Sequence, residues 1–287
     1  MTTSTSGGPT VRRILVGVQL RRLREERGIT REDAGYVIRA SGSKISRLEL
    51  GRVSFKERDI ADLLSYYGVE DLRQREALLS MARDANNPGW WHRYDDVLPS
   101  WFQTYVGLEE SASLIRTFEM QFVPGLLQTQ DYARAVMAAG QPELSRQEIE
   151  RRVELRMARQ RILTRSKPPK LWAVIDEAAL RRPIGGTQVI RAQIRHLIDL
   201  MDRPNITVQV MPFRFGGHAA EGGAFSILRF PETDLPDIVY VEQLVSALYL
   251  EKREQVDRYA QTMDRMTIDS QPPDLSMVSL NKLIAHL

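Results

Sequence analysis

The sequence predicts an all-α N-terminal domain of five helices, residues 1–86, followed by a larger α+β domain, residues 87–287. Apolar residues recur with the spacing of amphipathic helices through the first part of the chain. The stretch NNPGWW, residues 86–91, then combines Asn, Pro and Gly, which favour a break between helices and a domain boundary. Alternation of apolar and polar residues, the pattern of half-buried strands, begins only after residue 170.

The composition is that of a globular protein and excludes several kinds of chemistry. Of 287 residues, 43% are hydrophobic and 27% are charged, as in ordinary globular domains. No stretch approaches the ~20 consecutive apolar residues of a membrane span. The absence of Cys excludes disulfides, thiolate metal sites and Cys nucleophiles. The N-terminal MTTSTSGGPTVRR lacks the apolar segment of a secretory signal, so we expect a cytoplasmic protein that makes no membrane contact.

The first helix is expected from about Ile14 to Gly28, where glycine is suited to end a helix. Its apolar side chains at helical spacing are those of Val16, Leu20 and Leu23. Three arginines are expected on its outward face: Arg21, Arg22 and Arg24.

Two short helices follow. Thr30 begins a T-x-x-D capping pattern for a helix over residues 31–38, and Ser41 offers the N-cap of a third helix over residues 42–50, closed by Gly51. Two short helices joined by a turn of about three residues have the geometry of a helix-turn-helix.

Other residues of this segment fit that geometry. Gly35 is expected where the two helices approach closely, and Ile38 and Ile45 are spaced to meet in a small core. Two further helices are expected, one over residues 60–67 that ends at Gly68 and one over residues 72–85.

Charge is distributed unevenly along the chain. Residues 1–58 hold 13 Lys and Arg against 6 Asp and Glu, a net charge of +7, whereas the rest of the chain carries −4. A basic N-terminal domain on a mildly acidic body indicates a local site for a polyanion such as double-stranded DNA. The alternative is a charge imbalance that only improves solubility.

The stretch TREDAGYVIRASGSKISRLELGR resembles the helix-turn-helix of the Xre family, the phage-lambda-repressor-like regulators. The resemblance implies a five-helix domain whose third helix enters the major groove of DNA. The chain departs from the usual pattern at four places. It has Ala34 for Leu, Gly35 for Ala and Arg39-Ala40 for Gly-Val or Gly-Ile, and Gly42 removes a side chain that often contacts a base.

Helix-turn-helix geometry assigns roles to the polar residues. The first turn of a recognition helix faces the base edges, which selects Ser43, Lys44 and Arg47. Phosphate contacts are expected near helix N-termini and in the following loop, from Arg31, Ser41, Arg52 and Lys56. Glu49 is expected to anchor the local backbone or a nearby Arg. The alternatives are a solvated charged face for each cation, and a protein-binding bundle for the whole domain.

The larger domain shows helical and strand patterns in turn. A capping box at Ser145 and Glu148 predicts a long helix to about Arg165, whose charges we expect mainly on an outer face, with a second DNA contact as the alternative. Its arginines are Arg146, Arg151, Arg152, Arg156, Arg159, Arg161 and Arg165. The other helices are expected over residues 107–117, 130–139 (N-cap Thr129), 177–182, 190–201, 254–268 and 275–285. Strands are expected over residues 171–176, 206–210, 225–229, 238–242 and 247–250.

Several separated segments of this domain occur in the order of one family. They are GWWHRYDDVLPSWFQTYVGLEESA, MQFVPGLLQTQDYARAV, ELRMARQRIL, LWAVIDEAALRRPIGG, NITVQVMPF and IVYVEQL. Together they resemble the antitoxin-like C-terminal domain of actinobacterial WhiJ-like Xre regulators. The resemblance implies a transcriptional regulator, often associated with a small partner protein encoded nearby, and supplies no ligand or catalytic residues.

No pattern indicates an enzyme, a cofactor or a bound metal. The four His residues lack metal-ligand spacing, and G-x-S-x-G and P-loop motifs are absent. The Gly-rich loop around His218 is expected to be a plain connection, with a lid over a small molecule as the alternative. We therefore expect a sequence-specific DNA-binding transcriptional regulator that acts as a homodimer, without catalytic residues. The alternatives are an antitoxin-like module that sequesters a small protein partner, and a ligand-responsive sensor.

Overall fold

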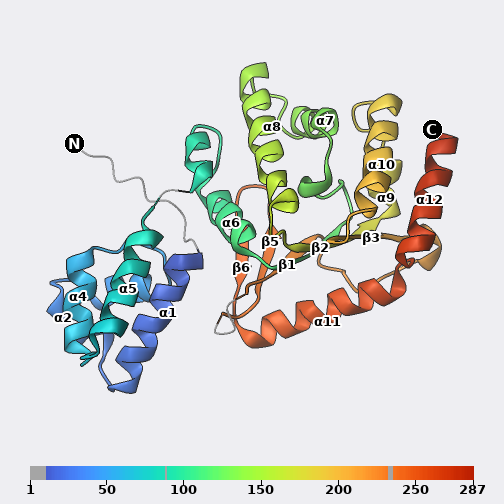
Figure 1. The fold of residues 1–287 in the computed structure, drawn as a ribbon. Coiled ribbons are helices and arrows are strands. Elements are labelled where there is room, and N and C mark those ends of the chain that lie inside the picture. The colour runs from blue at the N-terminus through green and yellow to red at the C-terminus, as the bar shows by residue number, and fades with distance from the viewer. Residues whose placement is uncertain (1–10, 88, 232–234) are drawn as a thin grey trace. The chain divides into compact units, whose positions relative to one another are not determined.

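The computed structural model describes residues 11–87, 89–231 and 235–287 (Figure 1). The chain forms two compact units, which we describe separately. The first unit extends to Asp95 and includes Pro99–Leu108, and the second contains Asp96–Leu98 and Glu109–Leu287. Within the described residues, every helix is too short or too polar to cross a lipid bilayer.

The first unit contains the five expected helices, which confirms the all-α assignment. They are α1 (Val11–Glu26), α2 (Arg31–Val37), α3 (Gly42–Glu49), α4 (Glu57–Tyr66) and α5 (Leu72–Ala85). A short 3-10 helix η1 (Trp90–Tyr94) and the start of α6 (Ser100–Ser111) follow. One apolar core joins the five helices, and both Ile38 and Ile45 are buried in it, as predicted.

Glycine ends three of these helices with the geometry that the sequence indicates. Gly28, Gly51 and Gly68 have φ values of 64°, 64° and 68°, in the left-handed region that glycine adopts without steric cost. After α1, for example, the Ile29 N–H donates to the carbonyl of Arg24 at 3.1 Å. Such bonds satisfy the last carbonyls of the helix and turn the chain sharply.

The second unit is a six-stranded mixed sheet with helices on both faces, which confirms the α+β expectation. Its strands are β1 (Leu114–Glu119), β2 (Lys170–Asp176), β3 (Ile206–Met211), β4 (Phe225–Arg229), β5 (Ile238–Glu242) and β6 (Ala247–Leu250). Their order in the sheet is β3-β2-β1-β4-β5-β6. β1, β2 and β3 are parallel, whereas β4, β5 and β6 pair antiparallel with their neighbours.

Figure 1 shows α11 on one face of this sheet and α7, α8 and α10 on the other. The helices are α7 (Gln130–Gly140), α8 (Arg146–Gln160), α9 (Glu177–Arg181), α10 (Thr187–Met201), α11 (Arg253–Asp269) and α12 (Pro273–His286). Short 3-10 helices lie at Gly125–Leu127 (η2), Arg161–Thr164 (η3) and Phe213–Phe215 (η4). Phe118 and Val174 of the sheet pack with Met263 of α11 in a buried cluster. Side chains alternate along a strand, so Glu119 points to the face opposite Phe118.

The expected helix over residues 107–117 is wrong after residue 111. α6 ends at Ser111, and Leu114–Glu119 is strand β1 in the middle of the sheet. β1 pairs with β2 on one side and with β4 on the other. These pairings join residues far apart in the sequence, and hydrogen bonding to both neighbours outweighs the weak helical pattern of the segment.

Local capping signals in the second unit are confirmed. The Thr129 side chain accepts a hydrogen bond from the Tyr132 N–H at the start of α7. Ser145 and Glu148 form the predicted capping box of α8. The predicted outer face of α8 is wrong in part, because Arg159 is buried and bonded to Glu109.

Candidate nucleic-acid interface

The helices α2 and α3 and the turn between them form the helix-turn-helix of the first unit. The Thr30 side chain caps α2 by accepting from the Asp33 N–H at 3.1 Å. The Ser41 side chain caps α3 by accepting from the Lys44 N–H at 3.3 Å. Both caps satisfy backbone donors that a short helix otherwise leaves unpaired, so they stabilise helices of only seven and eight residues.

Gly35 is required where α2 meets the turn. A Cβ there would lie 2.6 Å from the Ala40 carbonyl oxygen, closer than any side chain can approach. The predicted close approach is therefore present, although the neighbour is the backbone of the turn. Sequence analysis missed Gly17 on α1, where a Cβ would overlap the carbonyl of Glu49. The two glycines set how closely α1, α2 and the ends of α3 pack.

Arg39 occupies the turn with a φ of 54°, and no other non-glycine residue in the described part of the chain has positive φ. The left-handed region costs a side-chain-bearing residue roughly 1–2 kcal/mol. The Xre pattern that this segment resembles has glycine at this position, so the arginine introduces local strain.

We expect Arg39→Gly to stabilise the first unit by about 1 kcal/mol, because glycine adopts this φ without steric cost. Urea unfolding followed by circular dichroism measures the change. Gly28→Ala, at a φ of 64° and with no atom within 4 Å of the added Cβ, is the matched control and should destabilise the unit. Equal or lower stability of Arg39→Gly would show that the strain is relieved elsewhere.

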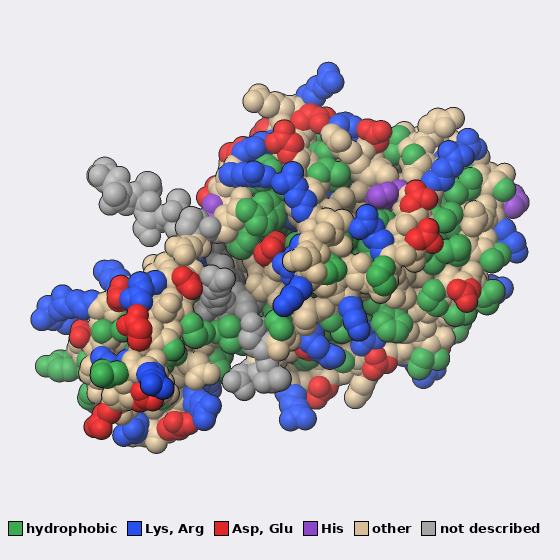
Figure 2. Space-filling model, in the orientation of Figure 1, with side chains coloured by type: hydrophobic (Ala, Val, Ile, Leu, Met, Phe, Trp, Pro, Cys, Tyr) green, Lys and Arg blue, Asp and Glu red, His purple; other side chains and the backbone are tan. Residues whose placement is uncertain are grey.

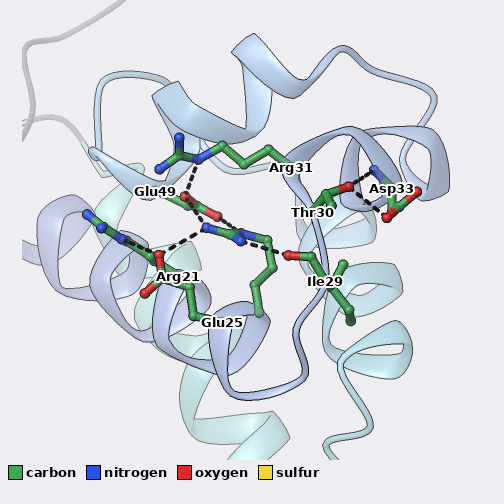
Figure 3. Close-up of polar contacts among 8 residues, drawn as sticks. Arg21, Glu25, Ile29, Thr30, Arg31, Asp33 and Glu49 are labelled. Carbon is green, nitrogen blue, oxygen red and sulfur yellow. Dashed lines mark hydrogen bonds and ion pairs between the residues drawn. The ribbon is translucent and has the colours of Figure 1, made fainter.

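A buried ion-pair network holds α3 in place (Figure 3). Arg24 of α1 is 6% exposed and Glu49 of α3 is 4% exposed. The Arg24 Nε donates to Glu49 Oε1, its Nη2 donates to Glu49 Oε2 at 3.2 Å, and its Nη1 donates to the Ile29 carbonyl at 2.8 Å. The hydrogen bond to Glu49 raises the pKa of Arg24. The outward position expected for Arg24 is therefore wrong, whereas the anchoring role expected for Glu49 is confirmed.

Arg31 extends this network to the surface. Its Nε donates to Glu49 Oε2 at 3.1 Å, and its side chain is 41% exposed. The guanidinium of Arg31 is thus fixed at one edge by a core carboxylate and open to solvent at the other. A cation held in this way is suited to bind a phosphate oxygen.

Five of the seven predicted contact residues are exposed around α3 and the following loop: Ser41, Ser43, Arg47, Arg52 and Lys56. Among the described residues, no hydrogen bond or ion pair engages the side-chain cations of Arg47, Arg52 and Lys56. In the view of Figure 2, Lys and Arg side chains of the first unit alternate with Asp and Glu. Cations without an ion-pair partner therefore identify the candidate interface better than the net charge of the first unit does.

Lys44 differs from the other predicted contacts. Its ammonium nitrogen lies 2.7 Å from Oδ2 of Asp59 on α4, and the lysine side chain is 30% exposed. In the free protein Lys44 is therefore engaged by a carboxylate, and its role in base contact stays a prediction. Sequence analysis also missed Tyr36, which is 86% exposed at the end of α2. The sequence signal that could have identified it is an aromatic residue close to the predicted turn.

Two family matches cover most of the chain. Residues 15–78 match a helix-turn-helix domain (HTH_31), and residues 102–282 match a domain of unknown function (DUF5753). The chain belongs to the DUF5753 family. Neither the curated proteins nor the solved structures contain a match to this DUF5753 chain.

The family match over residues 15–78 and the geometry of α2 and α3 lead to the same assignment for the first unit of the DUF5753 protein. It is a helix-turn-helix domain, a fold that supports a role as a DNA-binding regulator. The predicted domain boundary after residue 86 falls between the two matched segments.

Proposed function

We propose that this DUF5753 protein is a sequence-specific DNA-binding transcriptional regulator of the Xre type, whose α3 enters the major groove. The observation that carries the proposal is a set of unpaired cations, Arg47 on α3 and Arg52 and Lys56 in the loop that follows. The buried Glu49 fixes α3 in place. Ser43 and Arg47 contact base edges, and Arg31, Ser41, Arg52 and Lys56 contact phosphates. The proposal includes no catalytic step, no metal and no cofactor.

The protein acts in this proposal as a homodimer. One helix-turn-helix makes few base contacts, so two copies on a near-palindromic operator, about 34 Å apart, supply workable affinity and specificity. The second unit dimerises and receives the regulatory signal.

The proposal is tested by the binding of purified protein to DNA from its own upstream region and to scrambled DNA, over a salt series. We expect a preference of roughly 10³-fold or more for the specific sequence. The logarithm of the binding constant should fall steeply with the logarithm of salt concentration. Absence of binding to either DNA at low salt would overturn the proposal.

The pair Lys44–Asp59 makes a separate prediction for DNA binding. Asp59→Asn releases the Lys44 ammonium, and we expect tighter binding to the operator, measured by fluorescence anisotropy. Asp62→Asn is the control, because it removes the same charge from α4 but faces Arg58 at 3.8 Å. Adding Lys44→Ala to Asp59→Asn should abolish the gain. Equal gains from Asp59→Asn and Asp62→Asn would indicate a general charge effect without contact from Lys44.

A second candidate function is an antitoxin-like module that binds a small protein, with DNA binding for autoregulation. It is favoured by exposed apolar residues at the β5–β6 turn, where Leu244 and Val245 are 96% and 80% exposed, and on the adjoining strand β6, where Leu248 is 52% exposed. Neighbouring exposed apolar side chains mark protein-binding surfaces. Copurification of the protein encoded next to this one at fixed stoichiometry, lost in Leu244→Ser/Val245→Ser, would favour the module.

A further inference from the structure

The carboxyl end of β1 lies where the strand order of the sheet reverses. From β1 the chain proceeds to β2 and β3 on one side, and then returns to place β4, β5 and β6 on the other. In open sheets with parallel strands, ligands bind outside the carboxyl ends of the strands at such a point. Glu119 is the last residue of β1, and Glu242 is the last residue of β5, which runs in the same direction.

A turn at residues 124–128, held by hydrogen bonds, packs against α8 beside this end of the sheet. The Gln160 side chain of α8 donates to the carbonyls of Gly125 at 3.0 Å and Gln128 at 2.7 Å. The buried Gln128 side chain donates to the Val123 carbonyl at 2.7 Å and accepts from Nη1 of Arg156 at 2.8 Å. These bonds fix the position of the Arg156 guanidinium.

The other edge of that guanidinium is open. The Nε of Arg156 is buried and has no hydrogen-bond partner, and within the described residues its Nη2 makes no hydrogen bond either. Nε and Nη2 together form the edge that binds a carboxylate or phosphate through two parallel hydrogen bonds. Burial lowers the pKa of Arg156 to about 10, so the side chain is still a cation at neutral pH. A buried guanidinium nitrogen without a partner is costly, and an anionic ligand that accepts from it would remove that cost.

The carboxyl group of Glu119 makes no hydrogen bond or ion pair with any described residue. Burial, reinforced by the charge of Glu242, raises the pKa of Glu119 to about 8, although Arg156 opposes the shift. Glu119 is therefore mainly protonated at pH 7 and is a hydrogen-bond donor, like the open edge of Arg156. The groups that face it are Arg156 of α8, Glu242 of β5 and Tyr132 of α7, whose own pKa burial raises.

Glycine at position 125 leaves space beside Arg156 that a side chain would fill. A Cβ on Gly125 would lie 3.8 Å from Nε of Arg156 and 3.8 Å from Nη1 of Arg159. Arg159 itself is neutralised by Glu109, which accepts two hydrogen bonds at 2.8 and 2.7 Å. An alanine here would place a methyl group at van der Waals distance from the open edge of Arg156 and from the already neutralised Arg159.

We propose that Arg156 and Glu119, at the carboxyl end of β1, bind the carboxylate or phosphate group of a small molecule. Arg156 supplies two parallel donors and the positive charge, and protonated Glu119 supplies a third donor. The ligand accepts a hydrogen bond from the protonated carboxyl group of Glu119. The affinity of the protein for the ligand should therefore fall as Glu119 ionises above pH 8. The site lies wholly within the second unit and does not depend on the proposed binding of DNA.

The test titrates the full-length protein at pH 7 with sodium phosphate and, separately, with sodium acetate, each against sodium chloride of equal ionic strength. Binding is followed by the melting temperature and by the ¹⁵N–¹H resonance of the Arg156 Nε, assigned by its loss in Arg156→Lys. We expect saturable binding of at least one anion, and the tighter of the two identifies phosphate or carboxylate as the ligand group. Absence of saturation by both anions would overturn the proposal.

Three variants make the test specific. Arg156→Lys removes the parallel donors and should weaken binding at least tenfold, and Gly125→Ala should weaken it similarly without lowering the melting temperature of the free protein. Glu119→Gln keeps a donor and cannot ionise, so it should bind acetate, which is fully ionised at both pH values, equally well at pH 7 and pH 9. The surface variant Arg203→Gln is the control for loss of charge. Unchanged affinity in both Arg156→Lys and Gly125→Ala would refute the site.

Discussion

Glu49→Gln is expected to destabilise the first unit by about 3–5 kcal/mol, the usual effect of removing one partner of a buried ion pair. Arg24 is buried beside Glu49, and glutamine would leave its charge with only the half-exposed carboxylate of Glu25, at 3.3 Å, as a counterion. Urea unfolding of the full-length chain measures the loss. Hydrogen exchange of the buried residues Ile45 and Leu48 attributes it to the first unit.

Glu26→Gln is the matched control. Glu26 also pairs with an arginine, Arg22, but both side chains are more than half exposed. An exposed pair at this spacing contributes only about 0.3–0.5 kcal/mol. If Glu49→Gln lowered the free energy of unfolding no more than Glu26→Gln does, the ion-pair network would not be the interaction that holds α3 in place.

Arg47→Ala is expected to reduce affinity for the operator by about 1–3 kcal/mol and to relax the preference at one base position. Arg47 is exposed on α3. A side chain that contacts a base edge increases the affinity for one DNA sequence more than for others. Arg52→Ala should instead weaken binding to all sequences alike and reduce the salt dependence by about one counterion. Competition binding with operators substituted at single positions distinguishes the two outcomes.

Arg73→Ala, on the exposed start of α5, removes the same charge away from the helix-turn-helix. It should leave the base preference unchanged. A uniform loss across all sequences for both Arg47→Ala and Arg52→Ala would contradict the division between base and phosphate contacts.

Helix ends were predictable because they depend on residues within one turn of one another. Thr30, Ser41 and Gly51 act through bonds to backbone groups two to four positions away, so their signals are complete in the local sequence. Strand β1 was not predictable from its own residues, because its hydrogen bonds go to β2 and β4, about 55 and 110 residues later.

Of the candidate interface, the sequence could predict which residues are exposed, and it could not predict how they pair with residues of other helices. Helical spacing placed Ser43 and Arg47 on the surface of α3, and it could not show that Lys44 meets Asp59 on another helix. The same limit applies to Arg24, since an arginine between two other arginines suggests a solvent face until Glu49 packs against it. In the second unit, the packing of α8 against the sheet brings together Glu119, Gln128 and Arg156, which are far apart in the sequence.

The shared carboxylate of Glu49 links the interior of the first unit to its surface. Arg31 is ordered by Glu49 before any DNA arrives, so much of the rotamer entropy of an arginine, about 2 kcal/mol, is lost on folding and not on binding. Glu49 in turn depends on Arg24, which is buried in α1. An alanine scan for operator affinity would therefore report Arg24 as a contact residue, although its side chain never reaches the nucleic acid.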